Sequence, residues 1–273
     1  MVSEAARAGL WVYRQVRRTG LLAIPPVRRA YELVYGRYKR HLEDPFWNLA
    51  HHHPSLFTGG HIIDVGANIG YTAGVFAAAI QPGFRVLALE PSSENFQALE
   101  RSIAQRGLGH VIDARRAGVA DRVGTMALVL NPDHPGDHHV APPGGGDAAA
   151  PVERVPVTTV DEEVRARGLS PIAFIKIDVQ GYELQVCRGM TATLDANPGA
   201  AIVLEYSPES IRLYGGDPRE IAACFAPRGY VSYRVTQRGR LAAIDMHRLP
   251  AQLPPPGYID ILFTRAALAG DRG

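Results

Sequence analysis

The sequence has no apolar run long enough to cross a bilayer and only two cysteines among its 273 residues. A membrane-spanning helix needs about 20 consecutive, mostly apolar residues. The N-terminus also lacks an apolar stretch followed by a small-residue cleavage site, so we expect no secretory signal. Cys187 and Cys224 stand in apolar surroundings, which favours buried thiols over a disulfide or a metal pair. These features predict a cytoplasmic protein in a reducing compartment.

The sequence also has almost no excess of charge of one sign, with a formal net charge of +2. We therefore expect no nucleic-acid partner. Residues 1–41 are the exception, with nine arginines and lysines against two glutamates. This segment would allow peripheral contact with an anionic membrane, but an arginine-faced helix packed on the main domain explains it as well and is favoured. A hydrophobic content of 46% is typical of a globular chain with one large core.

A glycine-rich turn directly after a buried strand is the most informative feature of the sequence. Residues 61–65 predict the strand, Gly66 and Gly70 the turn, and residues 71–79 a helix. A second apolar strand then ends in Glu90. Glycine lets backbone N–H groups approach a ligand, and a carboxylate at the second strand tip can accept both hydroxyls of a ribose. The unit predicts a nucleoside site.

The glycine pair that cradles a pyrophosphate in dinucleotide-binding proteins is missing. The pattern is Asp64-x-Gly66-x-x-x-Gly70 in place of G-x-G-x-x-G. A carboxylate at Asp64 would repel a pyrophosphate and attract an ammonium group, such as the amino group of S-adenosylmethionine (SAM). We therefore favour a methyl donor over NAD and keep an NAD-dependent oxidoreductase as a weaker alternative.

Strands and helices alternate from residue 61 onward, which predicts a three-layer α/β sandwich with a mainly parallel sheet. Further strands are expected at 111–116, 125–130, 155–158, 172–177, 200–204, 230–235 and 259–264. Such sheets bind ligands at the carboxyl ends of their strands. Four apolar strands are each followed by an acid, and we expect these acids on one rim: Asp64, Glu90, Asp178 and Glu205.

Several motifs, taken in order, resemble the FkbM family of SAM-dependent methyltransferases over roughly residues 55–235. They are IDVGANIG at 63–70, LEPS at 89–92, VTTVD at 157–161, FIKIDVQGYE at 174–183 and VLEY at 203–206. The resemblance implies a class I methyltransferase, Rossmann-like fold with a seven-stranded, mostly parallel sheet and one antiparallel strand. We expect an N-terminal helical extension over 1–53 and a SAM-dependent methyltransferase domain over 54–273.

The resemblance also implies a donor site and a reaction. It places SAM on Asp64, Gly66, Ala67, Asn68, Gly70, Tyr71, Glu90, Pro91, Asn95, Ala117 and Gly118, with residues 116–119 as the adenine wall. It implies that this transferase methylates a hydroxyl of a sugar, a glycan or a polyketide-type natural product. Gln180 departs from the family, since many relatives have an acid there, and this weakens a metal or base role for the segment.

Methylation of a hydroxyl requires removal of its proton near the transition state. Asp178 is the first candidate for this role and Glu205 is its expected neighbour. The two carboxylates could share a Mg²⁺ ion. Alternatively, Asp178 only accepts hydrogen bonds from the backbone or from substrate hydroxyls.

Histidines in a loop over 131–151, dense in proline, glycine and aspartate, are the second candidates for a base. His134, His138 or His139 could act as a base at neutral pH, although a polar surface loop explains them equally well. An amine acceptor would need less help from a base, so N-methylation stays open. A non-catalytic SAM-binding protein is a weaker alternative, because the retained Asp178 and Glu205 argue against it. Neither the acceptor nor the oligomeric state can be read from the sequence.

Overall fold

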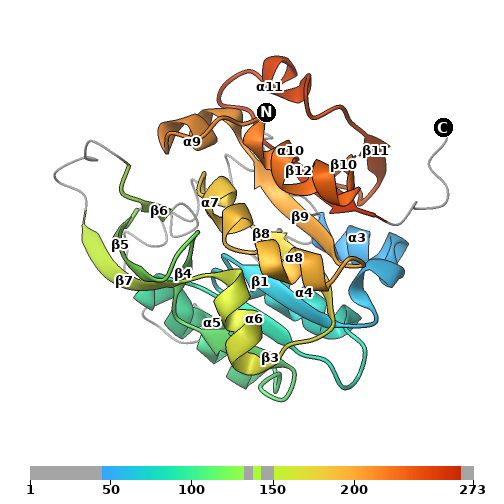
Figure 1. Cartoon of the computed structure of the whole chain (residues 1–273). Helices are drawn as coiled ribbons and strands as arrows, with labels where there is room; N and C mark the ends of the chain where they lie inside the picture. Colours follow the sequence, from blue (N-terminus) through green and yellow to red (C-terminus); the bar gives the residue numbers. More distant parts are fainter. Residues whose placement is uncertain (1–44, 132–137, 143–150, 266–273) are drawn as a thin grey trace.

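The computed structural model describes residues 45–131, 138–142 and 151–265. An 8-stranded sheet forms its centre, in the order β11-β10-β12-β9-β8-β1-β2-β3 (Figure 1). The strands are β1 His61–Val65, β2 Val86–Leu89, β3 Ile112–Arg115, β8 Ile172–Ile177, β9 Ala201–Tyr206, β10 Val231–Val235, β11 Leu241–Ala243 and β12 Ile259–Thr264. The predicted α/β class with a mainly parallel sheet is confirmed.

The strand count and directions differ from the prediction of seven strands with one antiparallel. Strands β9, β8, β1, β2 and β3 pair in parallel. Each of the pairs β9–β12, β12–β10 and β10–β11 is antiparallel, so β12 and β11 run against the other six strands. The additional strand is β11, which follows a tight turn at Gly239 with φ +69°. Only Leu241 of its three residues is buried, so no apolar pattern in the sequence predicts this strand.

A second, 4-stranded sheet stands beside the main one, in the order β4-β7-β5-β6 (Figure 1). Its strands are β4 Gly118–Val119, β5 Gly124–Val129, β6 His139–Val140 and β7 Val152–Thr158. The sequence predicts strands near β5 and β7 without separating them from the main sheet. The expected loop over 131–151 contains β6, which pairs with the end of β5.

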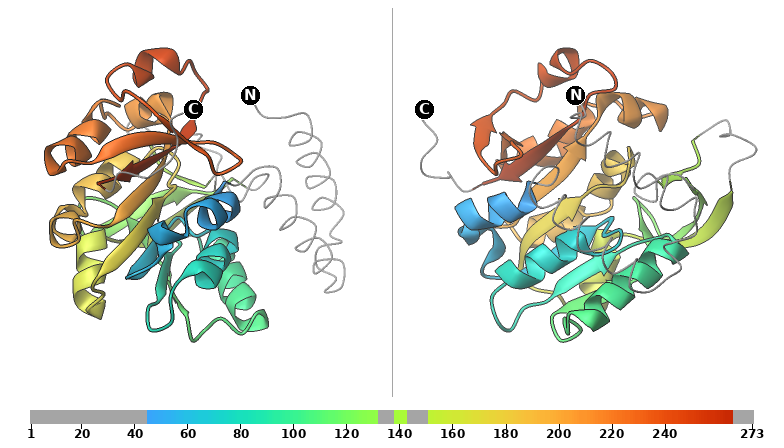
Figure 2. Two further views of the ribbon diagram at one scale, coloured as in Figure 1. Left: turned by 90° about the vertical axis from the view of Figure 1, so that its right-hand side faces the viewer. Right: turned by 180° about the vertical axis from the view of Figure 1, so that it is seen from behind.

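Helices cover both faces of the main sheet (Figure 2). One face carries α3 Phe46–His52, the 3₁₀ helix η3 Pro54–Phe57, α4 Tyr71–Ala79 and α5 Ser93–Gln105. The other carries α6 Val160–Arg167, α7 Glu183–Arg188, α8 Thr191–Ala196, α9 Pro208–Leu213, α10 Glu220–Phe225 and α11 Leu249–Gln252. A short 3₁₀ helix, η5 Ala226–Arg228, follows α10. The layers therefore agree with the predicted three-layer sandwich.

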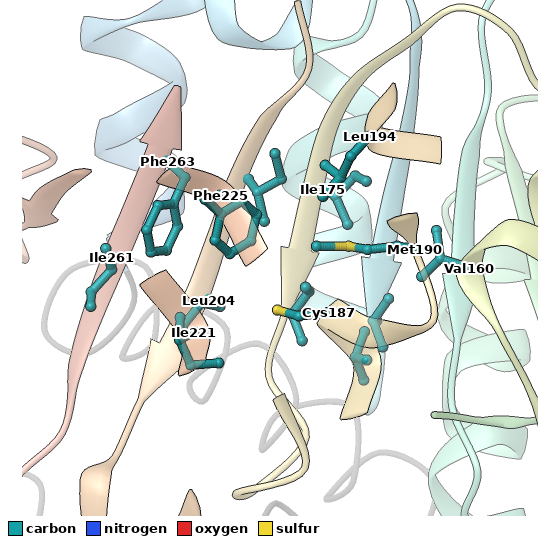
Figure 3. Close-up of a cluster of buried hydrophobic side chains, with 14 of the residues drawn as sticks. Val160, Ile175, Cys187, Met190, Leu194, Leu204, Ile221, Phe225, Ile261 and Phe263 are labelled. Carbon is teal, nitrogen blue, oxygen red and sulfur yellow. The ribbon is translucent and has the colours of Figure 1, made fainter. Parts of the chain in front are cut away.

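The two faces have separate apolar cores. Figure 3 shows the core beneath α6 to α10, where Phe225 stacks on Phe263 with ring centroids 4.1 Å apart. On the opposite face Phe46 of α3 meets Phe76 of α4 edge to face at 5.5 Å. Burial of this apolar surface fixes the strands, so their carboxyl ends form a rigid edge on which a site can be built.

Residues 46–52 belong to this packed structure, because Phe46 and Leu49 are buried against the sheet-covering helix α4. Residues 1–44, which make up most of the expected N-terminal extension, lie outside the described residues, so the predicted boundary at residue 53 stays a prediction. Within the described ranges no helix is both long enough and apolar enough to cross a membrane.

Candidate functional site

A pocket opens at the carboxyl ends of β1, β2 and β8, next to the second sheet. Its wall consists of Val65, Gly66, Asn68, Leu89, Glu90, Pro91, Asn95, Ala117, Gly118, Val119, Met126, Leu128, His138, His139, Val140, Asp178, Val179, Gln180 and Tyr182. The wall includes residues from the first, second and fourth motifs of the sequence. It therefore brings together seven of the predicted donor residues and three of the candidate bases, while their roles stay predictions.

The turn after β1 is built against the backbone of Asp178. Gly66 has φ +79°, and a Cβ added there would overlap the carbonyl oxygen of Asp178. The backbone N–H of Asp178 in turn donates to the carbonyl of Val65 at 3.1 Å. Glycine is needed at residue 66 for both its conformation and this close approach. The turn and Asp178 thus form one unit.

Glu90 follows β2 and is 5% exposed at the pocket wall. Its carboxylate accepts the backbone N–H groups of Asn68 at 2.9 Å and Ser92 at 3.0 Å. Burial raises the pKa of Glu90 to about 7, although these hydrogen bonds oppose the shift. Ligand hydroxyls that donate to this carboxylate would favour its ionised form. Ser92 also caps α5 by accepting the N–H of Asn95 at 3.4 Å.

An apolar wall lies on the side of the pocket next to Glu90. Ala117, Gly118 and Val119 supply part of it, where the adenine wall is expected. Met126 and Leu128 of β5 complete it, and a Cβ on Gly118 would already touch the sulfur of Met126 at 3.2 Å. Sequence reasoning missed both β5 residues. Their alternate spacing marks one face of a strand, but nothing in the sequence indicates which pocket that face meets.

Asp178 directly follows β8 and reaches the pocket with a side chain that is 38% exposed. The amide nitrogen of Gln180 donates to its Oδ1 at 3.0 Å. Glu183, fully buried at the start of α7, accepts the N–H groups of Val179 at 3.0 Å and Gly181 at 3.2 Å. Burial raises the pKa of Glu183 to about 7. Glu183 therefore holds the backbone of the loop that carries Asp178.

Glu205 lies within β9 and outside the pocket wall. Burial and the neighbouring charges of Asp178 and Glu183 raise its pKa well above the usual value. No group of three or more His, Cys, Asp or Glu side chains suited to a metal ion occurs among the residues that the structure describes. The described residues therefore offer no ligand set that would support a Mg²⁺ ion shared by Asp178 and Glu205.

Asp64 is buried within β1 and does not reach the pocket. Its Oδ2 accepts the hydroxyl of Thr72 at 2.7 Å, and its Oδ1 lies 3.4 Å from the ammonium of Lys176. Asp64 thus belongs to an internal ion pair, and its expected attraction of a ligand ammonium stays a prediction. Three other predicted donor residues also stand behind the wall and shape the turn and the start of α4: Ala67, Gly70 and Tyr71.

Of the candidate histidines, His134 lies outside the described residues, whereas His138 and His139 line the pocket. The Nδ1 atom of His138 accepts the backbone N–H of Asn131 at 3.0 Å. In a neutral ring Nδ1 is then the acceptor and the proton is on Nε2, which argues against a base role for His138. His139 lies in β6, opposite Val129 of β5.

Comparison with known proteins identifies the class to which this fold and site belong. Residues 64–231 match the family model of the methyltransferase FkbM domain. The match spans more than half of the chain, so the protein belongs to the FkbM methyltransferase family. Methyltransferase sdnD of Sordaria araneosa is 25% identical over 201 residues, which cover 64% of this chain and 76% of sdnD.

Two solved structures give weaker likenesses. Methyltransferase FkbM from Methylobacillus flagellatus KT has a TM-score of 0.49 and 18% identity over 84% of this chain. This chain spans only 50% of that protein. The O-methyltransferase TomG from Streptomyces achromogenes, in complex with SAM, has a TM-score of 0.48 and 13% identity over 81% of this chain and 80% of its own.

Proposed function

We propose that the protein transfers the methyl group of SAM to a hydroxyl of a sugar, a glycan or a polyketide-type small molecule. Methyltransferase activity follows from the family, whereas the donor and the hydroxyl acceptor are the proposal. The observation that carries it is the pocket, in which the carboxylates of Glu90 and Asp178 lie at the ends of two parallel strands, with an apolar wall beside Glu90.

The donor half of the pocket fits an adenosyl group in its chemistry. A ribose would donate its hydroxyls to Glu90, and an adenine would lie against the apolar side chains of Val119, Met126 and Leu128. When bound, SAM supplies a methyl group on a sulfonium, which is a good leaving group. This chain then has to orient the donor, exclude water and place the acceptor in line with the methyl group.

The acceptor half supports a hydroxyl substrate. Asp178 can accept a hydrogen bond from the acceptor hydroxyl and take its proton as the new bond to carbon forms. Gln180 keeps the carboxylate oriented through the bond to Oδ1. Tyr182 adds an aromatic surface beside Asp178, which suits the C–H face of a sugar ring. An amine acceptor would need less assistance from Asp178, which keeps N-methylation as the second candidate.

Transfer of labelled methyl from SAM tests this proposal, with one panel of sugars and hydroxylated small molecules and one panel of amines. We expect transfer to a hydroxyl and a loss of about 10²-fold or more in Asp178→Asn, since a missing base costs roughly this much. Asp245→Asn, an exposed acid remote from the wall, serves as the control. Transfer confined to amines and unaffected by Asp178→Asn would favour N-methylation instead.

A further inference from the structure

Lys176 is an unusual residue for this chain, which has 29 basic residues and only two lysines, Lys39 and Lys176. Lys176 lies in β8 and is 3% exposed. Lysine is almost never fully buried without partners for its charge. Its compact ammonium can fit among several oxygen atoms where the planar guanidinium of arginine cannot. The choice of lysine here therefore indicates a specific set of contacts.

The ammonium of Lys176 joins the two halves of the pocket. It donates to the carbonyl of Gly66 at 2.8 Å, in the turn after β1. It also lies 3.5 Å from Oδ2 of Asp178 and 3.4 Å from Oδ1 of Asp64. The first contact belongs to the donor side and the second to the acceptor side. One side chain thus connects the glycine turn with the proposed base.

The charge of Lys176 also acts on acids at the ends of other strands. It lowers the pKa of Glu90 after β2 and that of Glu205 in β9, against the larger effect of burial. Uncharged groups also favour the ionised Glu90 carboxylate: the backbone N–H groups of Asn68 and Ser92 and the side chain of Asn95. Lys176 adds a positive charge to these hydrogen bonds.

We propose that Lys176 is a positioning residue of the methyl-transfer site, whose buried ammonium holds the donor turn and the Asp178 carboxylate in one arrangement and supplies the positive charge for the surrounding acids. This inference rests on the proposed function and deepens it. A simpler role is an internal ion pair with Asp64 that only stabilises the fold. The contacts to Gly66 and Asp178 go beyond that role, because neither is needed to neutralise Asp64.

The two roles differ in the pH dependence of binding of S-adenosylhomocysteine, the demethylated form of SAM. In the wild type we expect affinity to rise with pH through the pKa of Glu90, about 7, because ribose hydroxyls favour the ionised carboxylate. Lys176→Met keeps the apolar stem and removes the charge. The midpoint should then move up by about one pH unit, as expected for loss of a nearby opposite charge. Affinity at pH 7 should fall about fivefold, because the ionised fraction of Glu90 falls from about one half to about one tenth.

A second variant is needed in case Lys176→Met does not fold, because this substitution leaves the buried Asp64 carboxylate with only the hydroxyl of Thr72 as a partner. Lys176→Met combined with Asp64→Asn removes both buried charges and retains an acceptor for Thr72, which should recover thermal stability. The raised midpoint should persist, at least in part, because the ammonium that favours the ionised form of Glu90 is absent from this variant too. A wild-type midpoint in the folded double variant would overturn the proposal. Failure of the wild type to bind S-adenosylhomocysteine would instead reject the proposed donor.

Discussion

Replacement of Glu183 by glutamine should change how the stability of the protein depends on pH. Glu183 is buried at the start of α7, where burial raises its pKa from 4.5 to about 7. Between these two values the folded protein keeps a proton that the unfolded chain has lost. The free energy of unfolding therefore falls as the pH rises through this range, and the loss is complete above about pH 7.

The size of this effect follows from the shift in the pKa. One proton contributes about 1.4 kcal/mol for each pH unit, so a shift from 4.5 to about 7 corresponds to at most about 3 kcal/mol. Glutamine retains an acceptor for the N–H groups of Val179 and Gly181 but does not titrate. Glu183→Gln should thus gain stability over the wild type as the pH rises, up to this limit near pH 8.

Urea denaturation of the two proteins at a series of pH values measures this difference. The raised pKa of Glu90 also makes the free energy of unfolding fall as the pH rises. Glu183→Gln should therefore keep a pH dependence of stability, but a weaker one than the wild type. Glu100→Gln, on the exposed side of α5, is the matched control and should follow the wild type. Parallel curves for the wild type and Glu183→Gln would refute the assignment of a raised pKa to Glu183.

Three further substitutions test separate parts of the pocket. Gly66→Ala should lower the free energy of unfolding by about 1–3 kcal/mol or more, as measured by thermal denaturation. The positive φ at residue 66 is strained for alanine, and the alanine Cβ would overlap the Asp178 carbonyl. Met126→Ala should lower the affinity for S-adenosylhomocysteine about tenfold, as measured by calorimetry. An unchanged affinity would show that Met126 does not contribute to the donor site. His138→Asn, which keeps an acceptor for the Asn131 N–H, should retain methyl-transfer activity. A loss of that activity in the variant would make His138 a candidate base again.

Much of the frame of the site could be predicted because local signals and tertiary packing agree there. The apolar runs of β1, β2 and β8 are buried on both sides, and each ends at the rim of the pocket. The caps at Ser92 and Thr159 also follow from sequence, since a hydroxyl before an acidic first turn satisfies free N–H groups. Where the residues of one short segment determine its structure, that structure can be predicted from the sequence.

The positions that could not be predicted depend on contacts between distant segments. Asp64 and Glu205 were expected with the other acids on one rim, but neither belongs to the pocket wall, since both lie within a strand, where successive side chains point to opposite faces of the sheet. Lys176 appeared only as one letter of an apolar motif, since two of its three partners, Asp64 and Gly66, come from a distant part of the chain. Met126 likewise reaches the pocket through the pairing of β5 with β7, which no local pattern encodes.

Calorimetric titration with S-adenosylhomocysteine is the most direct test of the central claim, that the pocket at Glu90 binds the methyl donor. The account predicts binding in the micromolar range near pH 8 for the wild type and for Glu100→Gln, with NAD bound far more weakly. Glu90→Gln loses the charge that the ribose hydroxyls require and should bind at least about tenfold more weakly. Absence of wild-type binding, equal affinity in Glu90→Gln, or tighter binding of NAD would contradict the account.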